Sequence, residues 1–220
     1  MSELVTTYVL GENAGVAWPM ERDQFYSEQY KTFKETGKSS KAVAVVQILL
    51  FNEHGEIFIQ KRSNDKAHNP GLLDKSIGGH ISAGDSAPYT VMVETVQELQ
   101  VPSIVLPTTE EFIKAHKLMQ RYLSTVALIK YVDSQTGPFI KVIKNEKIEI
   151  FNKYYLYFGI YSGSIKTVDR ESKGTLQYSL EDLEKEIEKF PDTFTYDLAY
   201  FIRTYKDKIK EFIALTSRNR

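Results

Sequence analysis

The sequence predicts a domain of the mixed α/β or α+β class, in which helices cover a β-sheet. Residues 42–51 (AVAVVQILLF) form an apolar run rich in β-branched side chains, which is typical of a buried strand. Residues 87–100 have helical apolar spacing and follow Ser86, a residue type that caps helices. Residues 154–161 alternate as a strand against a core does. Strands and helices therefore share one chain.

Short turns separate these elements. The sequence Asn-Glu-His-Gly at 52–55 supplies turn chemistry between 42–51 and a second strand at 56–62, which predicts a β-hairpin. Residues 77–81 (IGGHI) predict a short strand that breaks into a loop permitted by glycine. In the helix that follows, Val91, Val96 and Leu99 are the expected core contacts.

The second half of the chain is less regular. Residues 110–123 have partial helical spacing, and element boundaries between 101 and 153 are poorly defined. Ser179 is positioned to cap a helix that Pro191 ends, and a final helix is expected from Thr195 to Leu215. We expect one domain over 1–220, with an N-terminal extension over about 1–40 and C-terminal helices over about 179–216.

Composition excludes several classes of function. The 28 basic and 29 acidic side chains nearly cancel, so no global field attracts nucleic acid or an anionic membrane. There are no cysteines, which excludes disulfides, zinc–thiolate sites and thiol nucleophiles. The first ten residues do not have the pattern of a signal peptide, and no apolar stretch approaches the roughly 20 residues that span a bilayer. A cytoplasmic protein with no membrane partner is expected.

Two acidic residues of the predicted helix could do chemistry. Glu94 and Glu98 are four positions apart, so they share one helical face, and no basic residue lies three or four positions from either within the helix. Such a pair is repulsive by roughly 0.2–0.5 kcal/mol. A hard divalent cation such as Mg²⁺ would neutralise it. The alternative is a solvated acidic face, which is common on helices.

The wider pattern around this pair resembles the Nudix box, G-x5-E-x7-R-E-U-x-E-E-x-G-U, where U is apolar. Four positions match the box outright: Gly79, Glu94, Glu98 and Val101. Asp85 is a shortened acidic equivalent of the first glutamate. Four positions depart from it: Val93 replaces arginine, Thr95 an apolar residue, Gln97 glutamate and Gln100 glycine.

The resemblance implies a fold, a cofactor and a reaction. The fold would be a Nudix-type α/β/α sandwich with a mixed β-sheet, extended here by C-terminal helices. The box would bind Mg²⁺ or Mn²⁺ through Glu94 and Glu98, helped by the amide of Gln97 and by Gly79, with Glu94 or a carboxylate from 101–153 as the base for water. The implied reaction is hydrolysis of a phosphate anhydride in a nucleoside diphosphate-linked or related organic pyrophosphate. A homodimer would be the family's usual assembly.

Residues around and at the start of the box resemble the isopentenyl-diphosphate-isomerase-like Nudix branch, so that the similarity covers roughly 16–205. They are Gln60-Lys61-Arg62-Ser63, Lys66, Pro70-Gly71, Asp74, Gly79-His80, Glu171 and the segments 178–183 and 190–195. Arg62 and Lys61 are candidate phosphate contacts, or the solvated end of a strand. His80 is a candidate substrate contact, or a structural histidine. The isomerase chemistry itself is excluded, because Gly78 stands where that enzyme has its catalytic cysteine.

The departures from the box leave a second function open. A Nudix-like module could bind or sense a nucleotide without hydrolysing it, because Val93 and Gln97 remove charges that the family uses. Binding without metal-dependent turnover would distinguish this module from a hydrolase.

Overall fold

The computed structural model describes residues 3–11, 15–143, 146–165 and 172–217. Its strands are β1 (Leu4–Val9), β2 (Ala17–Glu21), β3 (Lys41–Phe51), β4 (Ile57–Arg62), β5 (Leu73–Asp74), β6 (Ile77–His80), β7 (Ser103–Leu106), β8 (Ala127–Ile143), β9 (Glu146–Ile160) and β10 (Ser172–Tyr178). Its helices are α1 (Arg22–Thr36), α2 (Ala87–Leu99), α3 (Thr109–Met119), α4 (Leu180–Lys189), α5 (Tyr196–Thr204) and α6 (Lys206–Thr216), with 3-10 turns η1 (Gln120–Tyr122) and η2 (Pro191–Thr193).

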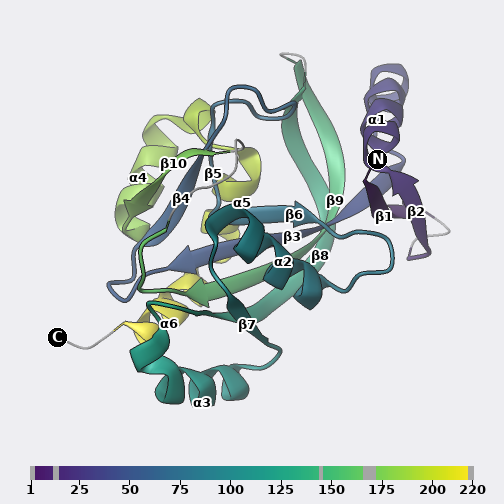
Figure 1. Cartoon of the computed structure of the whole chain (residues 1–220). Coiled ribbons are helices and arrows are strands. Elements are labelled where there is room, and N and C mark those ends of the chain that lie inside the picture. The colour runs from purple at the N-terminus through teal and green to yellow at the C-terminus, as the bar shows by residue number, and fades with distance from the viewer. Residues whose placement is uncertain (1–2, 12–14, 144–145, 166–171, 218–220) are drawn as a thin grey trace.

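All ten strands of the described residues join one mixed sheet, whose main order is β10-β4-β3-β9-β8-β7. The β3–β9 and β7–β8 pairs are parallel, and the other pairs are antiparallel. Figure 1 shows the sheet curling, with α2 in front of it and α5 and α6 behind it. This arrangement confirms the predicted mixed class.

Strand β3 is buried on both faces. Val43, Val45 and Leu49 belong to the apolar cluster that α5 and α6 cover, whereas Val46 and Ile48 belong to the cluster beneath α2. Successive side chains of a strand point to opposite faces, so a continuous apolar run is what a doubly covered strand requires. The prediction of a buried first strand is confirmed.

The predicted hairpin is only partly correct. Both strands form, but the ladder pair that joins β3 to β4 among the described residues is Phe51 with Ile57. Strand β6 pairs with β3 instead, through positions such as Ile48 with Ile77, while β5 pairs with β4. The chain thus crosses from β4 to β3 between residues 74 and 77. Local turn chemistry cannot reveal such a competing partner.

Helix α2 confirms the predicted helix at 87–100. The Ser86 hydroxyl accepts a hydrogen bond from the Tyr89 amide at 3.3 Å, which is the capping arrangement. Val91 and Leu99 are buried, but Val96 is 51% exposed, so its prediction as a core contact is wrong. At 100° per residue, Val96 lies with exposed Tyr89 on the outer side of the helix.

The C-terminal helices differ from the prediction in one respect. Ser179 caps α4 as expected. The single helix expected from Thr195 to Leu215 is instead two helices, α5 and α6, separated at Tyr205. Tyr205 leaves the helical conformation, and its hydroxyl lies 2.9 Å from both Tyr154 Oη and Asp133 Oδ2. These buried contacts hold the break in place.

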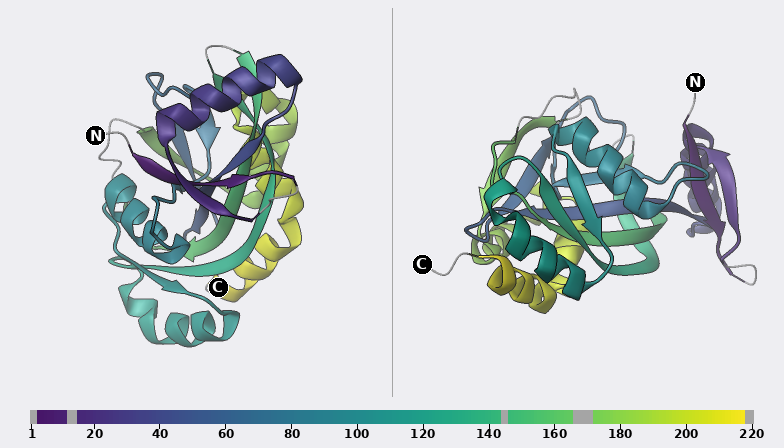
Figure 2. Two further views of the ribbon diagram at one scale, coloured as in Figure 1. Left: turned by 90° about the vertical axis from the view of Figure 1, so that its right-hand side faces the viewer. Right: turned by 60° about the horizontal axis from the view of Figure 1, so that its bottom comes forward.

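The N-terminal extension is structured and stands to one side of the body. Figure 2 shows the β1–β2 hairpin and α1 grouped at that side. Strand β1 joins the sheet by pairing with residues 41–43 of β3. Helix α1 brings Tyr26 to the body, where its hydroxyl contacts His80 and Lys141. None of the helices in the described ranges is long and apolar enough to cross a membrane.

Candidate active site

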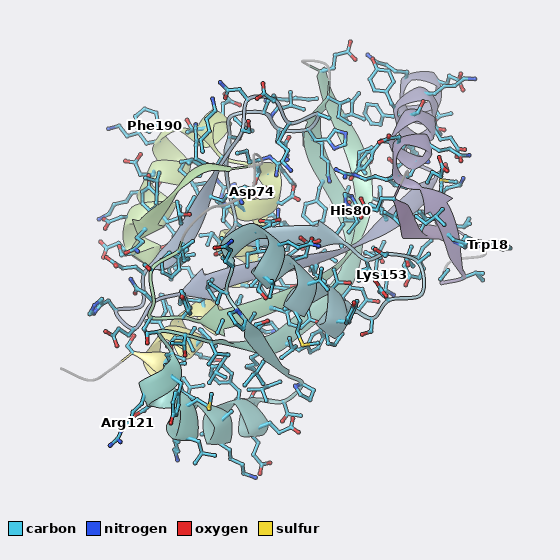
Figure 3. The ribbon with its side chains drawn as sticks, viewed as in Figure 1. Trp18, Asp74, His80, Arg121, Lys153 and Phe190 are labelled. Carbon is cyan, nitrogen blue, oxygen red and sulfur yellow. The ribbon has the colours of Figure 1, made fainter. Side chains whose placement is uncertain are left out.

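A cleft of about 420 Å³ is lined by residues of β3, β4, β6 and α2, among others. Six of the seven predicted site residues line it: Arg62, Gly79, His80, Glu94, Gln97 and Glu98. Lys61 does not, because neighbouring residues of a strand point to opposite faces and Arg62 points in. In the view of Figure 3, Asp74 and His80 both lie above α2. Residues of β4, β6 and α2 thus meet at this cleft. Glu171, which was part of the resemblance in sequence, lies outside the described residues.

The two glutamates both face this cleft from α2. Glu98 is 6% exposed, and Gln60 donates a hydrogen bond to its Oε2 at 3.0 Å. The carboxyl group of Glu94 packs directly on Gly79, where an added Cβ would lie 2.6 Å from Glu94 Cγ and closer still to the carboxyl group. Glycine at 79 is therefore needed for Glu94 to occupy its position.

The oxygen donors on the α2 side of the cleft fit a hard divalent cation. Two carboxylates one helical turn apart supply oxygen ligands, and Gln97 adds an exposed amide oxygen beside them. Within the described ranges, no group of three or more histidine, cysteine, aspartate and glutamate side chains is gathered as a metal site. A cation held here would accordingly depend on two glutamates together with neutral oxygen donors.

Two departures from the box have local explanations. Thr95 is fully buried, and its hydroxyl lies 2.8 Å from that of Ser103 and donates to the Met92 carbonyl at 3.0 Å. The polar atom therefore has partners inside the core. Gln100 has φ 55° and ψ 31°, the left-handed conformation that usually selects glycine at a helix end. The backbone keeps the shape that the missing glycine would favour.

Arg62 is held by protein groups rather than left available to a ligand. Its guanidinium donates to Asp74 Oδ2 at 3.0 Å, to the His68 carbonyl at 2.9 Å and to the Asn69 carbonyl at 3.2 Å. These contacts fix the loop that follows β4. They favour the structural alternative for Arg62 over a forked phosphate contact.

Asp74, Lys75 and Asp197 form a buried ionic network that lines the cleft beside Arg62. Lys75 Nζ lies 2.9 Å from Asp74 Oδ1 and 3.7 Å from Asp197 Oδ2, and Thr195 donates to Asp74 Oδ1 at 2.7 Å. Burial opposes ionisation of Asp74, but Lys75 and Arg62 outweigh it and hold the pKa of that carboxyl well below its usual range.

The lysine of this network also explains why position 78 is glycine. A Cβ on Gly78 would lie 2.7 Å from Lys75 Cε. A side chain at this position would require the end of the Lys75 side chain to move.

The opposite end of the cleft is basic, and the sequence did not predict it. Lys141 of β8 donates to Tyr26 Oη at 3.3 Å, and that hydroxyl lies 2.8 Å from His80 Nε2. Burial together with Lys141 and Arg22 lowers the pKa of His80 well below its ordinary value. The same causes lower the pKa of His68 to about 3. Both imidazoles are therefore neutral at physiological pH.

Lys141 keeps its charge in this setting. Burial lowers its pKa, but Tyr26 and Asp197 outweigh that effect and raise it above the ordinary value. Lys141 is also the one lining residue that the described part of 101–153 contributes, so no described carboxylate of that region, the alternative to Glu94 as the base, lines the cleft. Only pairing of distant segments brings this lysine to the cleft.

Two buried acceptors on the cleft wall need a donor. Gln47 Oε1 and Asp197 Oδ1 belong to residues that are 3% exposed, and neither atom has a hydrogen-bond partner among the described residues. Buried polar atoms in this position are satisfied by water or ligand.

The curled mixed sheet and the helix above the cleft define the Nudix fold, as solved structures show. The crystal structure of DR0079 from Deinococcus radiodurans matches 92% of this chain and 98% of its own, with a TM-score of 0.59 and 18% identity. A Nudix hydrolase from Alicyclobacillus acidocaldarius matches 81% of this chain and 98% of its own (TM-score 0.51, 11% identity). The MutT protein of Methanosarcina mazei Go1 matches 77% of this chain and 96% of its own, with a TM-score of 0.50 and 18% identity.

In sequence, the chain is similar to an uncharacterized Nudix hydrolase of Pseudomonas aeruginosa. The two are 33% identical over 92 residues, which is 41% of this chain and 53% of that protein. The chain thus spans about half the length of this curated relative. No family model matches the chain.

Proposed function

We propose that this chain is a metal-dependent Nudix hydrolase that cleaves a phosphate anhydride in a nucleoside diphosphate-linked or related organic pyrophosphate. The observation that carries the proposal is the pairing of Glu94 and Glu98 in one cleft, with Gly79 making room for the Glu94 carboxyl group. The similarity to Nudix hydrolases in sequence and fold supports it.

In this proposal each residue has a stated task. Glu94 and Glu98 hold Mg²⁺ or Mn²⁺, which when bound supplies a more acidic water and neutralises charge developing on the anhydride. Gln60 keeps the Glu98 carboxylate in position through its hydrogen bond. Gln97 contributes an amide oxygen at the exposed side. Glu94, the less buried of the two acids, accepts the proton of the attacking water.

The test is a screen of nucleotide sugars, dinucleotides and nucleoside di- and triphosphates with Mg²⁺ or Mn²⁺. Glu98→Gln keeps the shape of the side chain but removes its charge, so turnover should fall by about 100-fold or more, the scale of losing a main electrostatic contribution. Glu110→Gln on α3, an exposed acid in a salt bridge with Lys114, is the matched control and should retain full activity. Equal turnover by Glu98→Gln and the parent protein contradicts the proposal.

A second candidate, a module that binds a nucleotide without hydrolysis, is favoured by one observation. The exposed position beside the two glutamates holds the neutral Gln97, which weakens the field that a cation would meet. Gln97→Glu should therefore raise Mg²⁺ affinity, measured by calorimetry, and should raise turnover if the protein is a hydrolase. Tight ligand binding with no turnover in either protein would select the binding module.

A further inference from the structure

The two ends of the cleft have opposite character. The α2 end holds Glu94 and Glu98, whereas the end at α1 and β8 gathers Arg22, which is paired with Glu3, together with Lys66 and Lys141 beside His68 and His80. A substrate with several phosphates would meet a cation site at one end and fixed positive charge at the other. The basic end is the part of the cleft that the proposed function does not use.

Lys141 interacts electrostatically with the Asp197 carboxylate, but not at ion-pair distance. Among the described residues it forms no ion pair, and its ammonium instead donates to Tyr26 Oη and lies 5.4 Å from the Tyr26 ring centroid. Because Tyr26 Oη accepts from Lys141, its own proton is directed to His80 Nε2. The ring proton of His80 is then on Nδ1, where it can donate to an oxygen in the cleft.

Beyond these donors, the Tyr26 and His68 side chains separate the cleft from a neighbouring cavity. The Tyr26 and His68 rings pack with centroids 4.1 Å apart, and these two side chains border both the cleft and a separate cavity on the far side. The loop that carries His68 is fastened to β8, because the Asn69 amide donates to the Val142 carbonyl at 3.0 Å and Asn69 Oδ1 accepts from the Val142 amide at 2.8 Å. A group bound here has little room to continue past the rings.

We infer that the basic end, formed by Tyr26, His68, His80 and Lys141, binds the terminal phosphate of the substrate, so that the chain prefers anhydrides ending in a free phosphate to those in which both phosphates carry organic groups. This rests on the proposed function and narrows its substrate class. A terminal phosphate carries close to two negative charges at pH 7 and three acceptor oxygens. A capped phosphate carries one negative charge. Its organic group would collide with the Tyr26 and His68 rings.

The reaction on such a substrate is balanced by one water molecule. The water oxygen forms a bond to one phosphorus, the bridging P–O bond breaks, and the departing phosphate keeps the electron pair. The water proton passes to a carboxylate of the cleft and then to solvent. A diphosphate ester yields an organic monophosphate and inorganic phosphate.

The decisive comparison uses matched pairs that differ only in the cap: ADP with ADP-ribose, GDP with GDP-mannose and UDP with UDP-glucose. The parent protein should favour the uncapped member of its best pair by at least about tenfold in kcat/KM.

Lys141→Met should lower kcat/KM for that member by about 10- to 100-fold, mainly through KM, and leave kcat/KM for the capped member nearly unchanged. Lys141→Arg should retain most of the preference, and Lys130→Met, on the same strand but outside the cleft lining, should retain all of it. A preference for capped substrates, or equal loss on both members in Lys141→Met, overturns the inference.

A binding measurement separates this inference from the proposed function. Calorimetric titration of metal-free Glu98→Gln with inorganic pyrophosphate should show binding that Lys141→Met weakens by at least about tenfold. If the hydrolase proposal fails but this difference is found, the terminal-phosphate site stands. If hydrolysis is confirmed and pyrophosphate binding does not depend on Lys141, the site is refuted.

The separation of the cleft from the neighbouring cavity provides an independent test. His68→Ala removes the ring that packs on Tyr26 and joins the cleft to the neighbouring cavity, so kcat/KM for the capped substrate should rise several-fold relative to the uncapped one. His68→Asn, which is smaller but polar, serves if the alanine variant does not fold. An unchanged ratio in a folded variant contradicts separation by these rings.

Discussion

Replacing Gly79 by alanine tests the contact on which the Glu94 position depends. The added methyl group would overlap the Glu94 carboxyl group and lie 2.6 Å from its Cγ, so that side chain must leave its rotamer. A displaced flexible side chain costs about 0.5–1.5 kcal/mol, so the free energy of unfolding should fall by about 1 kcal/mol. If the proposed function is correct, hydrolysis should fall further, by about 10- to 100-fold, because a displaced Glu94 would bind the metal less well.

The assay combines urea denaturation with the Mg²⁺ dependence of turnover. Gly137→Ala in β8 is the matched control, since a Cβ there meets no atom within 4 Å, and stability should change by less than about 0.5 kcal/mol. In a Glu94→Ala background the overlapping atoms are gone, so Gly79→Ala should cost nearly nothing. If Gly79→Ala destabilises that background as much as the parent protein, the steric argument is refuted.

Three further predictions concern stability. Gln100→Gly should raise the free energy of unfolding by about 1 kcal/mol in urea denaturation, because glycine relieves the left-handed backbone; a loss would contradict this. Asp74→Asn should cost about 3–5 kcal/mol by leaving buried cations without their partner, whereas Asp192→Asn, in an exposed pair with Lys147, should cost less than about 1 kcal/mol; similar costs would contradict the network. On acidification from pH 7 to 5, the unfolded chain protonates His68 first, because the pKa of His68 is about 3 when folded and 6.5 ordinarily, so stability should fall by up to about 2 kcal/mol. Denaturation of His68→Asn at both pH values should show a smaller fall.

Sequence reasoning worked best where a single element carries the signal. Glu94 and Glu98 share a face because helical geometry alone dictates it, and Ser86 marks the start of that helix chemically. The sequence was a weaker guide to the side of α2 that faces the sheet, because Val96 is apolar but faces outward. Periodicity also runs on through Tyr205, where tertiary hydrogen bonds break the helix.

The basic end could not be found in the same way. Lys141 and Tyr26 are ordinary residues of a strand and a helix, and they gain a joint role only when β8 and α1 meet. Arg62 was found from the sequence, but its contacts with the Asp74 carboxylate and the His68 carbonyl depend on the folded loop. Three-dimensional pairing, rather than local propensity, decides such roles.

The parallel pairing of β3 with β9 has a consequence for how the protein is made. Partners such as Ala42 and Phe151 are separated by roughly a hundred residues, so the central ladder closes a long loop before it gains any stability. Sheets built from such distant pairs fold slowly, with a high contact order. During synthesis, the edge of β3 that pairs with β9 stays without this partner until β9 has left the ribosome, although β1, β4 and β6 can pair with β3 earlier.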